Sequence, residues 1–166
     1  MKVAIVHDWL VALRGGEKCL KFFLELYPKA DIYTLFHKEG STYPEIDKRV
    51  KKVSYLQKIC FTDHRKLLPL YPLGARSLKI SGYDLVISIS HAAAKNVSIL
   101  GESTLHISYC LTPMRYIWDQ AESYLGNKRY LFYPLINRLR EWDREGSERV
   151  DYFTAISKLV AARIRK

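Results

Sequence analysis

Apolar and polar positions along the chain alternate between the periods of strands and helices. The stretch KVAIVHD, residues 2–8, is a short β-branched apolar run, which is typical of a strand buried on both faces of a sheet. The stretch EKCLKFFLELY, residues 17–27, has apolar residues at helical spacing and ends before Pro28. A loop with Gly15 and Gly16 lies between them. Strand, loop and helix in this order predict the opening of an α/β sheet.

The same alternation continues toward the C-terminus. Further strands are expected at residues 31–36, 51–56, 83–90, 104–110 and 151–157. The longest helix is expected between residues 128 and 150, with an apolar face of Leu131, Leu135, Leu139 and Trp142. Its other face carries Arg129, Arg138, Arg140, Arg144 and Arg149. We expect this basic face to lie in solvent rather than on an anion or a membrane.

Strands separated by helices predict an α/β fold, a single Rossmann-like, doubly wound and mainly parallel sheet. We expect one domain over residues 1–157. Residues 158–166 are expected to start a helix that leads to a C-terminal nucleotide-sugar domain absent from this sequence. That helix has no Gly, Asn or Pro to end it at Lys166, which favours either an artificially truncated chain or the front half of a longer protein.

Composition narrows the class of protein. The 166 residues are 48% hydrophobic and 27% charged, which suits one globular core. No apolar run approaches the roughly 20 residues that span a bilayer, and the N-terminus is too short for a signal peptide. We therefore expect a cytoplasmic protein.

Cys19, Cys60 and Cys110 lie far apart in apolar surroundings, so buried free thiols are expected rather than disulfides or a zinc site.

The net charge of +10 favours a polyanionic partner: nucleic acid, an anionic membrane face or a phosphorylated substrate. Charge alone does not choose among these. The basic residues are spread along the chain, and no nucleic-acid-binding motif is present, so nucleic acid is the least favoured of the three.

The loops that follow the strands are where an open α/β sheet binds its ligands. Gly15 and Gly16 stand before a helix N-terminus, whose N–H groups suit a phosphate or a sugar oxygen, but a plain turn explains them as well. His91 follows a strand and either contacts a ligand or caps the short helix that it begins. His106 alternates within a strand and is expected to be structural.

The loop YCLTPMRYIWDQ places a guanidinium, an indole and a carboxylate close together at Arg115, Trp118 and Asp119. This combination suits sugar and phosphate recognition, through stacking and charge-assisted hydrogen bonds. The alternative is a packed tryptophan with an internal Arg–Asp pair.

Ser157 is explained by capping of the last helix. No GxSxG, HExxH or Cys/His set is present, which disfavours a hydrolase or a zinc enzyme.

Four motifs, in the order VHDWL…RGGEKCL, YDLVISISHAAAKNV, SYCLTPMRYIWD and DYFTAISKLVAARI, cover nearly the whole chain. Together they resemble the N-terminal domain of retaining glycosyltransferases with the two-Rossmann-domain (GT-B) architecture. The group is glycosyltransferase family 4, in particular its mannosyltransferase-like members.

The resemblance implies transfer of mannose from GDP-mannose to a glycan or a polyprenyl-diphosphate-linked acceptor, with retention at the anomeric carbon. It implies no metal and no cofactor besides this nucleotide-sugar substrate. Roles carried over by motif are the donor-phosphate loop for Gly15 and Gly16, the cleft lining for His91, and the acceptor side for Arg115, Trp118 and Asp119. No catalytic residue is assigned. Because the nucleotide-gripping domain follows where this chain ends, residues 1–166 are expected to fold without transferring sugar.

One departure from the family pattern is Leu111, which stands before Thr112-Pro113 where members commonly have a histidine near the transferred sugar. This departure is the main support for a rival interpretation, a non-catalytic interaction domain that docks on a partner or a membrane. The positive charge also suits a peripheral contact with an anionic membrane, at the inner face of the plasma membrane.

Overall fold

The computed structural model describes residues 1–59, 63–119, 121 and 129–165. Six strands form the main sheet: β1 (Val3–Leu10), β2 (Asp31–His37), β3 (Val50–Val53), β5 (Leu85–Ser90), β7 (Leu105–Cys110) and β8 (Tyr152–Ala155). Two short strands, β4 (Ile80–Ser81) and β6 (Ile99–Leu100), pair separately. The helices are α1 (Gly15–Leu26), α2 (Pro44–Asp47), α3 (Tyr71–Ser77), α5 (Arg129–Glu148) and α6 (Lys158–Arg165). The 3₁₀ segments are Tyr55–Lys58, His64–Leu70 and Ala94–Asn96.

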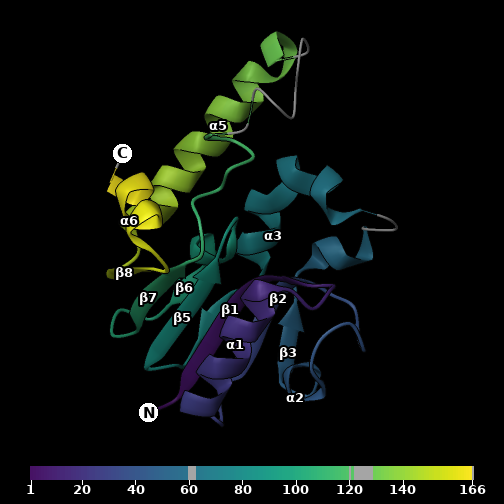
Figure 1. Cartoon of the computed structure of the whole chain (residues 1–166), viewed down its shortest axis with the longest axis vertical. Coiled ribbons are helices and arrows are strands. Elements are labelled where there is room, and N and C mark those ends of the chain that lie inside the picture. The colour runs from purple at the N-terminus through teal and green to yellow at the C-terminus, as the bar shows by residue number, and fades with distance from the viewer. Residues whose placement is uncertain (60–62, 120, 122–128, 166) are drawn as a thin grey trace.

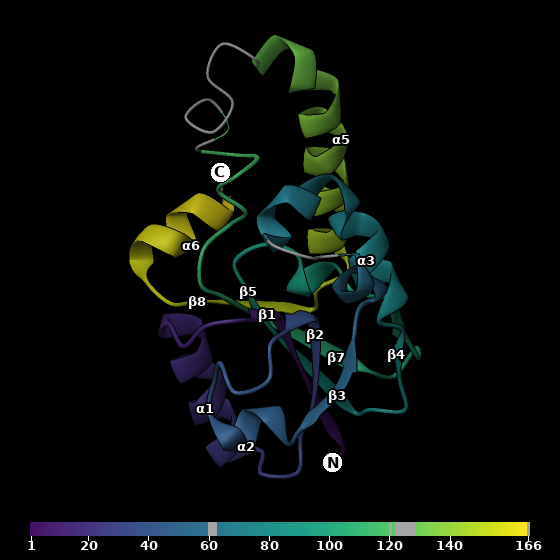
Figure 2. The ribbon, with the colours of Figure 1, turned by 90° about the vertical axis from the view of Figure 1, so that its right-hand side faces the viewer.

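The main sheet is parallel, in the order β3-β2-β1-β5-β7-β8. The chain starts in the middle, builds outward to β3, then crosses back to β5 and builds toward β8. Figures 1 and 2 show this central sheet with α1 and α2 on one face and α3 on the other. The expected α/β, doubly wound, parallel architecture is therefore confirmed. The division of the chain at residue 157 stays a prediction.

Each face of the sheet has its own hydrophobic core. On one face, strand residues such as Ile5 and Ile87 pack with Leu20 and Leu24 of α1. On the other face, the core joins α3 and α5 to the opposite sides of the same strands, with Leu139 of α5 among its buried members. Helices on both faces explain why the strand sequences are nearly continuous apolar runs.

Several element boundaries differ from those expected from the sequence. The helix α1 starts at Gly15, so both glycines belong to its first turn rather than to the preceding loop. The strand expected at residues 51–56 ends at Val53. Ser54 ends it, because its hydroxyl donates to the Leu35 carbonyl and accepts the Leu56 N–H, which opens a 3₁₀ turn.

The helix α5 confirms the expected long amphipathic segment. Leu139 is buried and Leu135 and Trp142 are half-buried, whereas the side chain of Leu131 lies outside the described part. Arg138, Arg144 and Arg149 are exposed, and the acidic residues Glu141, Glu145 and Glu148 are exposed with them. Arg140, expected on the same solvent face, is instead half-buried and donates its Nε–H to the Ile117 carbonyl at 2.7 Å. The outer face is therefore a mixed-charge, solvated face.

The outermost strand β8 differs from the other strands in its burial. Tyr152 and Phe153 are 64% and 36% exposed, whereas every residue of β1 and β5 is buried. On β7, the side of the strand that carries His106, Ser108 and Cys110 is buried. The sheet is thus well covered at its centre and thinly covered at the β8 edge.

No helix in the described part of the chain is long and apolar enough to cross a membrane. Cys110 is a buried free thiol, as expected, and Cys19 is a half-buried free thiol. Cys60 lies outside the described residues.

Candidate functional site

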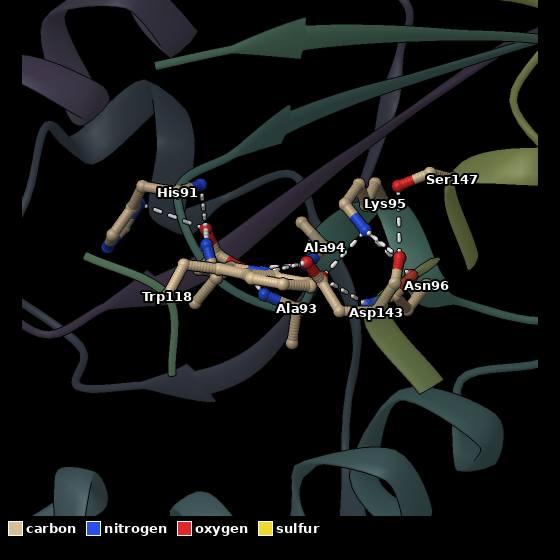
Figure 3. A network of polar contacts seen from close by, with 10 residues as sticks. His91, Ala93, Ala94, Lys95, Asn96, Trp118, Asp143 and Ser147 are labelled. Carbon is tan, nitrogen blue, oxygen red and sulfur yellow. Dashed lines mark hydrogen bonds and ion pairs between the residues drawn. The ribbon is translucent and has the colours of Figure 1, made fainter. Parts of the chain in front are cut away.

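The loops after β1, β5 and β7 meet at the carboxyl edge of the sheet, and the buried carboxylate of Asp8 ties two of them together. Its Oδ2 accepts the backbone N–H groups of His91 and Ala92 at 2.6 and 3.0 Å, and its Oδ1 accepts those of Ala93 and Ala94 at 2.5 and 2.7 Å. Four consecutive amides around one carboxylate fix the loop after β5 to the end of β1 (Figure 3).

His91 forms an ion pair with the same carboxylate. Its Nδ1 lies 2.9 Å from Asp8 Oδ2. Burial lowers the pKa of His91, but the charge and hydrogen bonding of Asp8 together with the charge of Glu17 outweigh burial and raise that pKa above its ordinary value. Burial likewise raises the pKa of Asp8, and the charge and hydrogen bonds of His91 outweigh it, so the pKa of Asp8 falls well below its usual range. The pair favours an imidazolium beside a carboxylate.

His7 is the neutral counterpart of His91. It is fully buried, and burial together with the charge of His91 lowers its pKa. Its Nδ1 lies 3.0 Å from the Trp9 carbonyl, which can only accept, so Nδ1 carries the proton. The other nitrogen, Nε2, has no hydrogen-bond partner among the described residues and faces Gly16.

The two glycines of α1 have different surroundings. A Cβ at Gly15 would meet no atom within 4 Å. A Cβ at Gly16 would lie 2.9 Å from His7 Nε2 and 3.2 Å from Leu111 Cδ1. The absence of a side chain at Gly16 therefore lets the start of α1 pack against the end of β1 and the loop after β7. Gly15, which is exposed, has no such packing role.

A cleft of about 110 Å³ opens beside this point. Its lining comprises Trp9, Val11, Ala12, Arg14, Glu17, His64, Arg65 and Tyr116. Small-molecule sites usually measure about 300–1,000 Å³, so this cleft suits one wall of a larger site. His91 borders it through Trp9, whose ring centroid is 4.4 Å from that of His91 in an edge-on contact. Gly15 and Gly16 do not line it, but Arg14 and Glu17, on either side of them, do.

The acceptor-side residues predicted from the sequence separate into different environments. Arg115 is exposed, and its positive charge opposes protonation of His91. Asp119 lies 3.4 Å from Arg163 of α6 in a partly exposed ion pair. Trp118 is half-buried and donates its indole N–H to Asp143 of α5 at 2.8 Å. The tryptophan is packed, as one alternative held, but the Asp119 pair is formed with Arg163 and not with Arg115.

Trp118 belongs to a buried polar network that joins α5 to the loop after β5 (Figure 3). Lys95 donates to the Asp143 carboxylate at 2.7 Å and to its carbonyl at 2.6 Å. Burial lowers the pKa of Lys95, and the charge of Asp143 opposes that shift. A Cβ at Gly146 would overlap Asn96, so α5 lies directly on this loop. The network fixes the framework behind the site.

Other sequence predictions are settled by direct contacts. His106 is buried with its Nε2 3.0 Å from Ser88 Oγ, and burial lowers its pKa to about 4, which confirms a structural role. The Ser157 hydroxyl accepts the Val160 N–H and caps α6, as expected. His91 does not begin a helix, since residues 91–93 form a bend that precedes the 3₁₀ turn Ala94–Asn96.

Within the described ranges, no three His, Cys, Asp or Glu side chains are grouped to hold a metal ion.

Sequence reasoning missed the central role of Asp8 and the part of His64 in the cleft. Asp8 bonds to residues 83 to 86 positions away, a separation that no local pattern reports. Its signal was a charged residue inside an apolar strand, which is expected to be paired when buried. His64 lies in a segment for which the sequence predicted no strand or helix, and nothing in its spacing distinguishes it.

Comparison of the chain with protein-family models, curated proteins and solved structures finds no match in any of the three. The candidate site therefore rests on its geometry and on the motifs of the sequence.

Proposed function

We propose that this chain is the acceptor-side half of a retaining glycosyltransferase that transfers mannose from GDP-mannose. The observation that carries the proposal is the contact of Gly16 with both His7 and Leu111. Through it, the glycine turn of α1 and the loop after β7 meet at one point of the sheet edge, beside His91. These are the segments whose motifs resemble the family, and a shared site is what the resemblance requires of them.

The electrostatics of this edge support binding of a diphosphate. The first turn of α1 presents N–H groups and the positive end of a 12-residue helix. Asp8 favours the cationic form of His91, which lies on the same edge. Fixed dipoles and a fixed cation of this kind stabilise negative charge that develops on a leaving diphosphate. The Glu17 carboxylate, which accepts the Arg14 N–H at 2.8 Å, opposes an anion at the mouth of the turn and restricts where it can lie.

The acceptor is assigned to the cleft bordered by Trp9 and Tyr116. The half-buried Tyr116 ring suits the apolar face of a sugar ring, whereas Trp9 is only 7% exposed and lies in the wall of the cleft. Arg14 supplies a charged donor for a phosphate or hydroxyl oxygen. We assign the acceptor class as a glycan or a polyprenyl-diphosphate-linked sugar. With this acceptor class we also propose a cytoplasmic location at the inner face of the plasma membrane.

A direct test is titration of the isotopically labelled chain with GDP-mannose, followed by amide chemical shifts. We expect GDP-mannose and GDP to shift the Gly15, Gly16 and His91 amides, and mannose alone to leave them unchanged. Equal shifts with guanosine, which lacks phosphate, would contradict the diphosphate assignment.

We also expect no sugar transfer by residues 1–166 alone, because the resembled family grips the nucleotide with a second domain. Robust turnover by this chain would refute that expectation.

A non-catalytic interaction domain is the second candidate, and the environment of Leu111 favours it. An apolar side chain packs on Gly16 where the family commonly places a histidine. Replacement of Leu111 by His discriminates the two candidates in the same titration. Tighter GDP-mannose binding by L111H than by the unchanged chain supports the enzyme, whereas equal or weaker binding by L111H favours the interaction domain.

A further inference from the structure

Two loops of the candidate site are tied to α5 through one side chain, the carboxylate of Asp143 (Figure 3). Its Oδ1 accepts from Lys95 Nζ at 2.7 Å and from Asn96 Nδ2 at 3.3 Å, and both donors belong to the loop after β5. Its Oδ2 accepts the indole N–H of Trp118, in the loop after β7, at 2.8 Å. Asp143 is 4% exposed. One buried carboxylate therefore fixes both loops to α5 and to each other.

The loop after β5 is anchored at both ends. Residues 91–94 donate their backbone N–H groups to Asp8, and the next two residues, Lys95 and Asn96, bond to Asp143. The Lys95 ammonium also donates to the Asp143 carbonyl at 2.6 Å and to Asn96 Oδ1 at 3.1 Å, so three acceptors surround its three donors. Because no residue separates the two anchors, a displacement of residues 95–96 also moves residues 91–94.

Charged side chains alternate in sign along this network, in the order His91, Asp8, Lys95 and Asp143. At most 23% of any of these four side chains is exposed. Burial lowers the pKa of Lys95, and the charges of Asp143 and Asp8 both oppose that shift. Asp8 therefore interacts with two cations, His91 at the site and Lys95 behind it.

Stability alone does not explain a Lys–Asp pair at this depth. The loss of hydration of two buried ions offsets most of their attraction, and apolar side chains of similar volume often give equal or greater stability. A buried ionic network does favour one arrangement of the groups that it joins, because a displaced loop leaves charges unpaired. In this chain the favoured arrangement is the one that places His91 against Asp8.

We propose that Lys95 and Asp143 are positioning residues of the candidate site, and that α5 acts through them to hold His91 against Asp8. Neither residue contacts the ligand, since both act through the loop after β5. The inference rests on the proposed function for the ligand, a nucleoside diphosphate, and adds that its affinity depends on the contacts of α5.

His91 also interacts with charged and titratable groups on several elements. These are His7 and Asp8 of β1, Glu17 of α1, His64 of the 3₁₀ segment His64–Leu70, and Arg115 of the loop after β7. A test of the positioning must leave all of these groups unchanged. A change in the pKa of His91 then reports a displacement of its imidazole rather than the loss of a neighbouring charge.

The test is the pKa of His91, followed by NMR of the imidazole across pH, together with the affinity for GDP. The variant Lys95→Met with Asp143→Asn removes one positive and one negative charge, so the net charge of the chain is kept. We expect the proton affinity of His91 to fall at least about threefold, toward that of an unpaired imidazole. GDP affinity should fall about threefold or more, because the displaced cation no longer faces the diphosphate.

Gly146→Ala tests the same contact with every charge kept. A Cβ at Gly146 overlaps the Asn96 side chain, so it pushes α5 away from the loop after β5, while alanine favours the helix itself. We expect the pKa of His91 and the GDP affinity to fall as in the double variant. The matched control is Lys51→Met with Asp31→Asn, which removes a Lys–Asp pair with the same 2.7 Å distance at the start of β2 and should change neither.

Thermal melts show which variants are folded, and Gly146→Ala decides alone if the double variant is not. An unchanged His91 pKa in a folded network variant would overturn the proposal and leave the network a purely structural role. An equal shift in the control would overturn it as well. Failure of the unchanged chain to bind GDP would refute the proposed function instead, and the pKa of His91 would still test the positioning.

Discussion

The imidazole of His91 lies 2.9 Å from the buried carboxylate of Asp8, and each shifts the pKa of the other toward the charged form. The pair joins the ends of two neighbouring strands, β1 and β5. Because both groups titrate with shifted pKa values, the charge at this edge of the sheet depends on pH.

The pair should stabilise the fold over a defined pH range. The pKa of His91 is higher in the folded protein than its ordinary value of 6.5. Protonation of His91 therefore stabilises the fold in full at pH below 6.5, and this contribution is lost as the pH rises through the raised pKa. The lowered pKa of Asp8 gives stability that is complete above its ordinary value of 3.8 and lost at lower pH. His91→Phe should therefore cost about 1–2 kcal/mol more at pH near 5.5 than at pH near 9.5 in urea unfolding.

His64 supplies the control for this pH dependence. Burial lowers the pKa of His64, so protonation opposes folding and its effect has the opposite sign. His64→Phe should gain stability relative to the unchanged chain as pH falls below 6.5. Two parallel pH profiles for the His91 and His64 variants would contradict the assignment of charge states.

The two glycines of α1 should respond oppositely to alanine. Gly16→Ala puts a Cβ against the His7 ring, which is buried and held through Nδ1, and should destabilise the fold by about 1–3 kcal/mol. Gly15→Ala meets open space and should be neutral or stabilise by up to about 0.5 kcal/mol. Thermal unfolding of both variants is the measurement. If both stabilise the protein, the close packing at Gly16 is wrong.

Removal of one charge from the network behind the site should be costly. Lys95→Met leaves the Asp143 carboxylate buried without its cation and should destabilise the fold by about 3–5 kcal/mol. The double variant with Asp143→Asn should cost less than the sum of the two single variants, with a coupling energy of about 2 kcal/mol. Additive costs in this double-mutant cycle would show that the two side chains do not interact.

Trp118 and Asp119 should differ in their contribution to stability. Trp118→Phe removes the indole donor from Asp143 and should cost about 1–2 kcal/mol. Asp119→Asn removes a partly exposed pair with Arg163 and should change the unfolding free energy by less than about 0.5 kcal/mol. The reverse order in chemical denaturation would argue that Asp119, rather than Trp118, holds the loop after β7.

Local sequence patterns predicted the elements of this fold well, because a buried parallel strand is a short apolar run and an amphipathic helix repeats every three to four residues. They failed where a single side chain decides a boundary. The hydroxyl of Ser54 ended a strand early, and Gly15 was placed outside a helix that it begins. The pattern also gave no warning of the 3₁₀ turn after Val53.

The candidate site was predicted in outline and not in its contacts. The sequence located the loops, since parallel strands end at a common edge. It could not place Asp8 against residues 91–94, because that contact depends on strand order. It also grouped Arg115, Trp118 and Asp119, whereas in the fold Arg115 is exposed, Trp118 bonds to Asp143 and Asp119 pairs with Arg163.

The thin cover of β8 has a consequence for handling the protein. A four-residue outer strand with an exposed Tyr152 and Phe153 offers unpaired backbone groups and aromatic surface to another chain. Folding at high protein concentration therefore competes with intermolecular strand pairing at this edge. The opposite edge strand β3 carries Lys51, which pairs with Asp31, and Lys52, which donates to the Leu78 carbonyl, and lysines on an edge strand oppose pairing with a second copy. Since only the β8 edge of each molecule can then pair, association through it should stop at a dimer.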